Sequence, residues 1–568
     1  MKRSWSLFLA GCAAILAGCL LAFFTQTAGG VRVEDVRFTG TGGTPMSGLL
    51  YIPRNATPKT PAPGILAVHG YINSRETQDG FAIEFARRGY VVLALDQTGH
   101  GYSGGFASSN GFGGPDGLKF LRGLDVVDPN NIGLEGHSMG GWTVLAAAKA
   151  MPDAYKAVVL EGSSSGAPFA APGTPQWPRN LAVVFSQYDE FSWLMWNAPL
   201  GGKTVPSSPK LMTQFGTQTP VVTGRLYGSI AAGDARRLYQ PATTHPGDHI
   251  SPQAIADAVD WFAQTLKGGT PRPASDQIWP LKELGTAIAF AGVVVLMLGA
   301  FDLFLALPAF AELVQAPAAA RDRRDGRWWT GFLLTALIPV ISFYPFMFLG
   351  MTYFKPSALF PQSITNQILT WAVLNALITL VINLMFRRPR EAGGARVSAS
   401  IGVAVATVGV AYAALLIADF LFKVDFRLWV VALKLLSPAQ FRAFLAYLLP
   451  FTAFFVVALG ALQGNLTVRG DGAAAQYGWS IAALSLGFAL FIACQYIPLA
   501  ITDHLPIPQE ALNAIVSLQF LPLMAVVGLI STFTWRRTGS ALPGALICGL
   551  FVTWYMVAGT AIQFGGSL

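Results

Sequence analysis

The apolar positions of this chain follow two different patterns. From about Gly30 to Lys267, short apolar runs alternate with polar stretches, as in an ordinary globular domain. From Leu281 to Phe564, the apolar runs approach the roughly 20 residues that a helix needs to cross a lipid bilayer. The pattern predicts a globular domain followed by an all-α, polytopic transmembrane bundle.

Within the globular part, strand patterns alternate with helical patterns. The apolar runs that we expect to form strands are 64–68, 90–96, the run from 132 into Ser138, 156–160, 181–185 and 237–240. Helical patterns cover 81–88, 117–121, the Ala-rich stretch after Ser138 and 252–262. This alternation predicts an α/β fold with a mostly parallel, doubly wound sheet, whose functional residues follow the carboxyl ends of the strands.

The first apolar run, residues 6–24, follows the basic start Met1-Lys2-Arg3. It fits a cleaved signal peptide or a membrane anchor, and Cys12 and Cys19 each end a Leu-Ala-Gly-Cys that looks like the lipobox of bacterial lipoproteins. Because the apolar run continues past Cys19, we expect an uncleaved anchor. The expected domains are an anchor at 1–29, a globular domain at 30–268, a linker at 269–283 and a helical domain at 284–568.

About eight further spans are expected from apolar length, at 284–308, 330–352, 366–386, 400–422, 443–464, 479–500, 512–535 and 541–563. Alternate loops carry the arginines and lysines: Lys2, Arg3, Arg321, Arg323, Arg324, Arg327, Arg387, Arg388, Arg390, Arg396, Arg469, Arg536 and Arg537. The positive-inside rule places these loops and the N-terminus in the cytoplasm, and the globular domain on the extracytoplasmic face of the inner membrane. Segment 423–442 holds Lys423, Arg427, Lys434 and Arg442 and opposes this rule; we expect it outside, as an amphipathic surface helix.

Composition narrows the possible partners. The chain of 568 residues is 53% hydrophobic and 12% charged, which indicates a membrane protein, and its formal net charge of +8 arises mostly in the cytoplasmic loops. We therefore expect contact with the lipid bilayer and no nucleic-acid partner. The four cysteines all lie in apolar spans, so the globular domain has no disulfide framework or thiolate metal site, and no cofactor or metal is expected. The oligomeric state stays open.

The strongest chemical motif is Gly136-His137-Ser138-Met139-Gly140, set between a predicted strand and a predicted helix. This is the context of a nucleophile elbow, in which a strained serine on a tight turn projects its hydroxyl above the sheet. Side chains at Gly136 or Gly140 would collide with neighbouring backbone, and Gly141 allows the helix to pack closely. The motif predicts Ser138 as a nucleophile.

The order of these pieces resembles the α/β-hydrolase superfamily, and in particular its dienelactone-hydrolase and prolyl-oligopeptidase-like branches. The resemblance is carried by His69-Gly70-Tyr71, by Asp96-x-x-Gly99-His100-Gly101-x-Ser103, and by Asp128 to Gly141. It covers about 240 residues and does not extend to the helical part. It implies an α/β-hydrolase fold and a Ser-His-Asp triad.

The resemblance also supplies the partners of Ser138. It implies His245 as the base, after the last predicted strand and before the helix at 252–262, with His249 as the alternative. Asp189 stands where the family carries Gly-x-x-Asp, although the glycine is Ser186 here, and Glu190 and Glu161 are alternatives. The oxyanion-hole donors are expected to be the backbone N–H groups of Tyr71 and Met139. Asp96, His100 and Ser103 are interpreted as a structural turn, and His137 as packed beneath the sheet.

The stretch between Asp189 and His245 contains Phe191, Trp193, Met195 and Trp196 and is expected to form a cap that suits an apolar acyl group. These features predict a membrane-bound serine hydrolase acting on carboxylic esters, thioesters or lipid-like acyl substrates. A serine-dependent acyltransferase of cell-envelope lipids uses the same residues and stays open. A peptidase, or a transporter or sensor with a binding-only domain, is less favoured, because the spans show no proton-relay chain and the elbow is intact.

Overall fold

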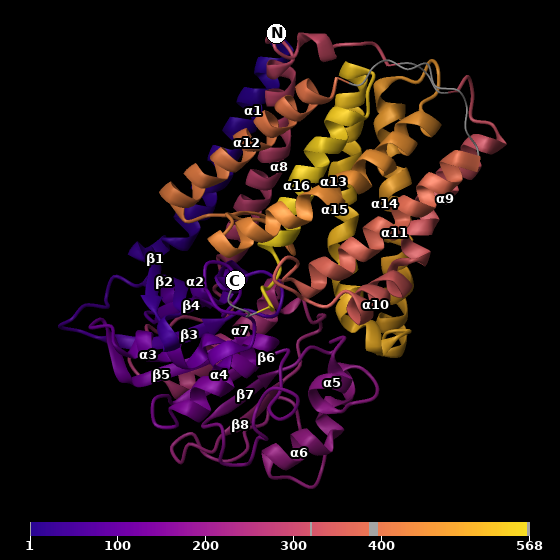
Figure 1. The fold of residues 1–568 in the computed structure, drawn as a ribbon. Coiled ribbons are helices and arrows are strands. Elements are labelled where there is room, and N and C mark those ends of the chain that lie inside the picture. The colour runs from indigo at the N-terminus through magenta and orange to yellow at the C-terminus, as the bar shows by residue number, and fades with distance from the viewer. Residues whose placement is uncertain (1, 318–320, 386–395, 565–568) are drawn as a thin grey trace.

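The computed structural model describes residues 2–317, 321–385 and 396–564, and it contains a sheet-based domain with a bundle of long helices standing over one side (Figure 1). The N-terminal end lies at the far end of the bundle, whereas the C-terminal end lies where the bundle meets the sheet domain. The arginines expected at 387, 388 and 390, and the last residue of the span expected at 366–386, lie outside the described residues.

The sheet has eight strands in the order β1-β2-β4-β3-β5-β6-β7-β8. Their bounds are Arg32–Thr39 (β1), Pro45–Ile52 (β2), Ala62–Val68 (β3), Val91–Asp96 (β4), Val127–His137 (β5), Ala157–Glu161 (β6), Leu181–Val184 (β7) and Arg236–Tyr239 (β8). Strands β1 and β2 pair antiparallel to each other and β2 pairs antiparallel to β4, while every other pairing is parallel. The mostly parallel sheet expected from the sequence is confirmed, and the antiparallel β1–β2 pair adds to it.

Helices cover both faces of the sheet because alternate strand residues point to opposite sides. On one face, Ile65 and Ala67 of β3 pack with α2 (Asp79–Arg87) and α7 (Pro252–Thr265). On the other, Leu66 and Val68 pack with α3 (Gly114–Arg122) and α4 (Met139–Ala150). Between β7 and β8 lie the short helices α5 (Ser192–Trp196) and α6 (Pro209–Phe215).

The helical domain comprises α1 (Lys2–Gln26), α8 (Trp279–Phe304), α9 (Gly326–Ile341), α10 (Phe343–Tyr353), α11 (Ser363–Met385), α12 (Val397–Phe422), α13 (Pro438–Leu466), α14 (Ala473–Thr502), α15 (Ala511–Thr538) and α16 (Leu542–Ala558). Among the described residues, seven helices are long and apolar enough to span a membrane, or eight if the bent pair α9 and α10 forms one span. Helix α16 is apolar but shorter. These helices indicate a membrane protein.

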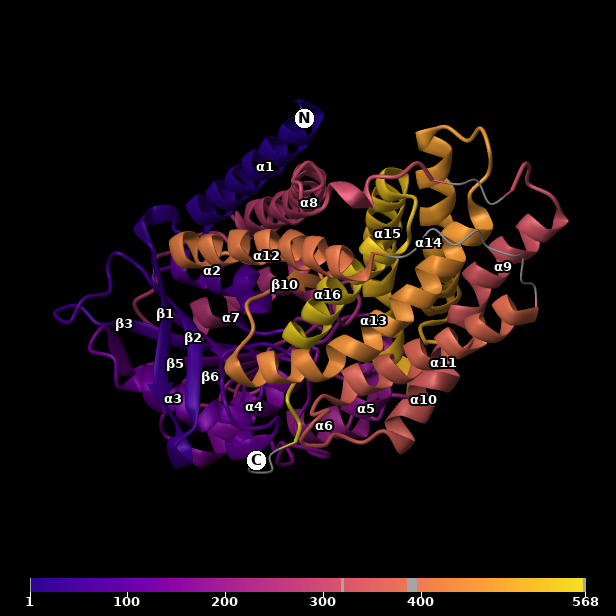
Figure 2. The same cartoon turned by 45° about the horizontal axis from the view of Figure 1, so that its top comes forward.

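Helix α1 packs lengthwise against α8, although the whole sheet domain separates them in sequence (Figure 2). The contact is close because glycines face it: a Cβ on Gly18 would lie 2.4 Å from the Gly285 carbonyl oxygen, and one on Gly11 would lie 2.5 Å from the Leu296 nitrogen. Small residues at such contacts let helix backbones approach, which strengthens packing in a bilayer. The first apolar run is therefore an integral part of the bundle.

The structure corrects two expectations for the helical part. Segment 423–442 is not an amphipathic surface helix: it forms a hairpin of β9 (Phe426–Leu428) and β10 (Val431–Leu433), followed by the start of α13. The hairpin is stabilised by burial, because Arg427 and Lys434 are largely hidden and pair with Asp425 and Glu76. The span expected at 330–352 is bent by 44° between α9 and α10.

Candidate active site

Ser138 occupies a strained turn between β5 and α4. Its backbone has φ 54° and ψ −120°, a conformation that non-glycine residues rarely adopt, and its N–H donates to the Glu161 carbonyl oxygen across 2.8 Å. A Cβ on Gly136 would lie 2.2 Å from the Gly140 carbonyl oxygen, and one on Gly140 would lie 2.1 Å from that of Val68. The elbow therefore requires both glycines, as the motif predicted.

His245 and Asp189 come together beside this elbow. His245 Nδ1 lies 2.8 Å from Asp189 Oδ2, so the carboxyl group orients the imidazole ring. With its proton on Nδ1, the neutral ring donates to Asp189 and leaves Nε2 as an acceptor. Burial and the nearby Asp248 raise the pKa of Asp189 well above its ordinary value. The other oxygen of Asp189 accepts the N–H of Phe191 across 2.7 Å, which fixes the carboxylate. Burial lowers the pKa of His245 to about 4, so the imidazole is neutral near pH 7 and its Nε2 is free to accept a proton.

Ser138 and His245 line the same cavity. Within the described part of the chain, the Ser138 hydroxyl makes no hydrogen bond to His245. In unliganded sites such bonds are often long and tighten only when substrate is bound. The strained serine and the histidine that Asp189 orients therefore face one cavity, the arrangement that a Ser-His-Asp triad requires.

The alternative residues occupy other positions. His249 also lines the cavity, and its ring centroid lies 4.0 Å from that of His137, but its buried Nδ1 has no partner among the described residues. Neither carboxyl oxygen of the buried Glu161 has a hydrogen-bond partner there. Glu190 accepts the backbone N–H of His245 rather than the ring proton. The geometry thus favours His245 with Asp189.

The expected oxyanion donors flank the nucleophile. Met139 begins α4, where backbone N–H groups have no partner within the helix, and Tyr71 follows β3; both line the cavity with Ser138. The Tyr71 carbonyl oxygen accepts from His100 Nε2 across 2.8 Å, and the Tyr71 hydroxyl accepts from Gln563. The two bonds hold the loop that carries the Tyr71 N–H.

The residues interpreted as structural make hydrogen bonds within the loops around the site. Asp96 accepts the hydroxyl proton of Ser47 and the N–H of Arg75, and the Ser103 hydroxyl donates to the Asp96 carbonyl oxygen across 2.7 Å. His137 is buried and bonds through Nε2 to the His245 carbonyl oxygen across 2.9 Å. Ser186, which replaces the expected glycine, donates to Asp248. Of these contacts, the one from His137 reaches His245 directly, and His137 also lines the cavity.

The cavity measures about 700 Å³ and is mostly apolar. The sheet domain contributes Met139, Trp142, Phe169, Phe191, Leu194 and Met195 to its wall, so part of the expected cap does cover the site. The helical domain contributes Trp429, Val430, Leu512, Ile515, Val516 and Phe564. No group of metal-binding side chains occurs among the described residues. The site therefore lies between the two domains and suits an apolar acyl group.

The contribution of the helical domain to the site was not expected from the sequence. Trp429 of the hairpin donates to the Pro246 carbonyl oxygen across 3.2 Å, beside His245. Tyr496 of α14 donates to Glu190 across 2.9 Å, and Gln563 reaches Tyr71. No local pattern marks these residues, because each contact joins positions at least 183 residues apart in the chain.

The sheet order, the elbow and the histidine–aspartate pair define an α/β-hydrolase domain, fused here to a domain of long apolar helices. Residues 59–188 match the family described as serine aminopeptidase, S33. A monoacylglycerol lipase of Mycolicibacterium smegmatis is 33% identical over 118 residues, which are 20% of this chain and 41% of that protein. The chain thus matches about two fifths of the length of this curated relative.

Matches among solved structures cover about two fifths of this chain. An esterase of Pyrococcus furiosus is 18% identical with a TM-score of 0.30, and the match covers 42% of this chain and 94% of the esterase. A thioesterase domain from the curacin biosynthetic pathway is 15% identical with a TM-score of 0.27, covering 41% of this chain and 99% of that domain.

Proposed function

We propose that this protein is a membrane-bound serine hydrolase that cleaves carboxylic esters, thioesters or lipid-like acyl substrates through an acyl-enzyme. The observation that carries the proposal is the 2.8 Å contact of His245 with Asp189, combined with a strained Ser138 that lines the same apolar cavity as His245. The monoacylglycerol lipase relative is consistent with an acyl ester substrate.

In the proposed reaction, His245 Nε2 takes the proton of Ser138 as the serine oxygen attacks the substrate carbonyl carbon. The Tyr71 and Met139 N–H groups stabilise the oxyanion, a contribution of on the order of 10² to 10³ in turnover for each donor. His245 then protonates the leaving alcohol or thiol, which leaves the acyl group on Ser138. A water molecule, deprotonated by His245, releases the acid and restores the serine.

The residues that line the cavity, and the helix that carries several of them, support an amphiphilic substrate. Its apolar wall includes Leu512, Ile515 and Val516 of α15, a helix long and apolar enough to lie in a membrane. An acyl chain held there would stay in apolar surroundings while its ester carbonyl approaches Ser138.

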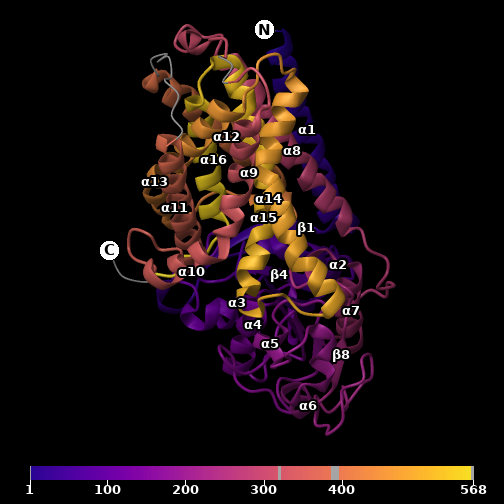
Figure 3. The ribbon, with the colours of Figure 1, turned by 90° about the vertical axis from the view of Figure 1, so that its right-hand side faces the viewer.

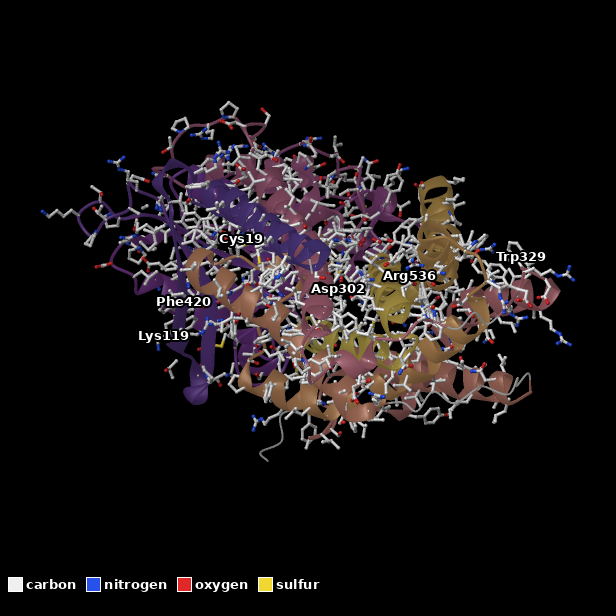
Figure 4. The ribbon with its side chains drawn as sticks, turned by 90° about the horizontal axis from the view of Figure 1, so that it is seen from above. Cys19, Lys119, Asp302, Trp329, Phe420 and Arg536 are labelled. Atoms are coloured by element: carbon white, nitrogen blue, oxygen red, sulfur yellow. The ribbon has the colours of Figure 1, made fainter. Side chains whose placement is uncertain are left out.

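We further propose that the hydrolase domain faces the extracytoplasmic side of the inner membrane. Figure 4 looks onto the end of the bundle away from the hydrolase domain, where Asp302, Trp329 and Arg536 are labelled. Arg537, in the last turn of α15, bonds to Asp302 at this end. At the opposite end, the opposing charges of Arg427 and Lys434 are buried in ion pairs with acids. The positive-inside rule therefore favours this orientation more strongly than loop charges alone indicated.

A fluorophosphonate probe tests the proposal directly. Detergent-solubilised wild-type protein is expected to be labelled, and Ser138→Ala to be unlabelled but folded. Absence of labelling in folded wild type would refute serine catalysis and leave a binding-only role. Product analysis with an added alcohol or amine then separates hydrolysis from acyl transfer, and a peptide substrate tests the peptidase alternative.

A further inference from the structure

The segment that carries Asp189 is held by the helical domain. Its neighbours Tyr188 and Phe191 pack against a small apolar cluster formed by Leu499, Leu505, Ala511 and Ala514, together with Tyr496. Trp193 Nε1 also donates to the Pro508 carbonyl oxygen across 3.0 Å. In Figure 3, α14 and α15 extend down from the bundle to the hydrolase domain, where these contacts are made.

Glu190 connects this contact to the predicted base. Its carboxyl group is buried, with the residue only 3% exposed. Oε2 accepts the backbone N–H of His245 across 2.8 Å, and Oε1 accepts the hydroxyl proton of Tyr496 across 2.9 Å. Two adjacent carboxyl groups therefore bond to one histidine: Asp189 contacts its ring and Glu190 accepts its backbone N–H. Of the two, Glu190 also bonds to helix α14, through Tyr496.

We propose that Tyr496 and Glu190 are positioning residues: α14, through the Tyr496 hydroxyl and the Glu190 carboxyl group, fixes the loop of His245 in the orientation that serves Ser138. This inference rests on the proposed serine hydrolase function. It makes the membrane domain a component of the catalytic geometry, in addition to its role as an anchor.

The hydrogen-bonding chemistry of Glu190 explains why position 496 is a tyrosine. Burial and the neighbouring Asp189 raise the pKa of Glu190 to about 8, so near pH 7 Glu190 holds a proton. A tyrosine hydroxyl both donates and accepts, so Tyr496 satisfies Glu190 whether or not it is protonated. Phenylalanine in its place would leave a buried carboxyl oxygen without a partner.

The first test replaces the hydroxyl alone. Tyr496→Phe in the full-length protein, assayed in detergent with a chromogenic acyl ester, is expected to lower kcat about tenfold, the effect of losing one well-placed hydrogen bond. We expect KM to change by less than about twofold, because the cavity wall is unaltered. Tyr353→Phe, at the exposed end of α10, is the matched control and should behave as wild type.

The second test asks whether the effect passes through Glu190. Glu190→Gln keeps an acceptor for the His245 N–H and offers an amide to Tyr496, so its kcat should stay within about threefold of wild type. Glu190→Ala removes both bonds and should lose kcat at least as strongly as Tyr496→Phe. Adding Tyr496→Phe to Glu190→Ala should then have no further effect, as expected for two residues that act in one chain.

The outcomes separate this inference from the function on which it rests. If wild type is labelled by fluorophosphonate and turns over esters, but Tyr496→Phe and Glu190→Ala match it in kcat, the positioning role is refuted while the serine hydrolase stands. A Tyr496→Phe loss that appears in KM alone, or that adds fully to Glu190→Ala, also refutes it. If folded wild-type protein is not labelled by fluorophosphonate at Ser138, the proposed function itself is refuted.

Discussion

The backbone N–H of Asn73 donates to the carbonyl oxygen of Gly559 across 2.8 Å. This bond joins the loop after β3, which carries Tyr71, to the residue that follows α16. Two more backbone bonds continue the contact: Ala107 donates to Ile562 across 2.7 Å, and Ile562 donates to Gly99 across 2.8 Å. The segment after α16 therefore lies against the loop that carries Tyr71 and against the loop after β4, whose Ala107 lines the cavity.

Removing one of these backbone donors should reduce catalysis. Ile562→Pro deletes the N–H that bonds to Gly99, and we expect kcat/KM to fall about tenfold because the loops lose a fixed neighbour. Ile562→Val keeps the donor and most of the side-chain volume, and should stay close to wild type. Equal activity of the proline and valine variants would show that the C-terminal segment does not support the site.

Asp189→Asn tests the orienting carboxylate. The amide keeps the shape of the side chain but no longer favours a proton on His245 Nδ1, so kcat should fall on the order of 10⁴-fold, as is typical of a Ser-His-Asp triad. The thermal midpoint should change little. A Glu161→Gln variant measured in parallel should retain activity, and the reverse ranking would move the catalytic acid to Glu161.

The two candidate bases can be separated by alanine substitution. His245→Ala should abolish ester turnover and fluorophosphonate labelling to the level of Ser138→Ala, because only His245 is bonded to a carboxylate through its ring. His249→Ala should keep turnover within about tenfold of wild type, since it changes only the cavity wall. Complete loss in His249→Ala with activity in His245→Ala would reverse the assignment.

Glu161 gives the protein a predictable pH dependence of stability. Burial and the nearby Asp248 raise the pKa of Glu161 well above its ordinary value, so the folded protein keeps this proton while the unfolded chain releases it above about pH 4.5. The contribution of Glu161 to the free energy of unfolding is therefore fully present below about pH 4.5 and is lost as the pH rises, by up to about 1.4 kcal/mol per pH unit.

Glu161→Gln cannot release a proton, so its advantage over wild type in the free energy of unfolding should grow from pH 5 to pH 8. Thermal or denaturant unfolding at both pH values measures the difference. Glu34→Gln, on the exposed strand β1, is the matched control. An advantage of Glu161→Gln that is the same at both pH values would mean that Glu161 is ionised in the folded protein.

The proposed orientation is open to cysteine labelling in intact cells. In a background with the exposed Cys12 and Cys494 replaced by alanine, Lys59→Cys in the hydrolase domain should react with a membrane-impermeant maleimide. Arg469→Cys, exposed at the other end of the bundle, should react only after the membrane is permeabilised. The opposite pattern would place the hydrolase domain in the cytoplasm.

Local pattern was sufficient for the α/β domain because each element there is defined by its own residues. The apolar runs at 64–68 and 90–96 became β3 and β4, and the Gly-x-Ser-x-Gly turn became the strained elbow at Ser138. Strand β1 was not predicted because its apolar residues, Val33, Val36 and Phe38, do not alternate regularly with polar ones. The helix predicted at 423–442 was wrong because its charges suggested a solvent-facing element, whereas burial against acidic partners stabilises a hairpin.

By itself, the sequence determined the two kinds of domain and indicated Ser138 as the candidate nucleophile, with candidates for its base and acid. Strand and helix periodicity and the geometry of a glycine-flanked serine are local properties of the chain. Only the tertiary structure decided that His245 bonds to Asp189, and that Glu190 joins the histidine backbone to Tyr496 of α14. It also decided that α15, the β9–β10 hairpin and the segment after α16 line the cavity. Those relationships depend on side chains from distant segments meeting in space, and no spacing along the chain encodes such a distance.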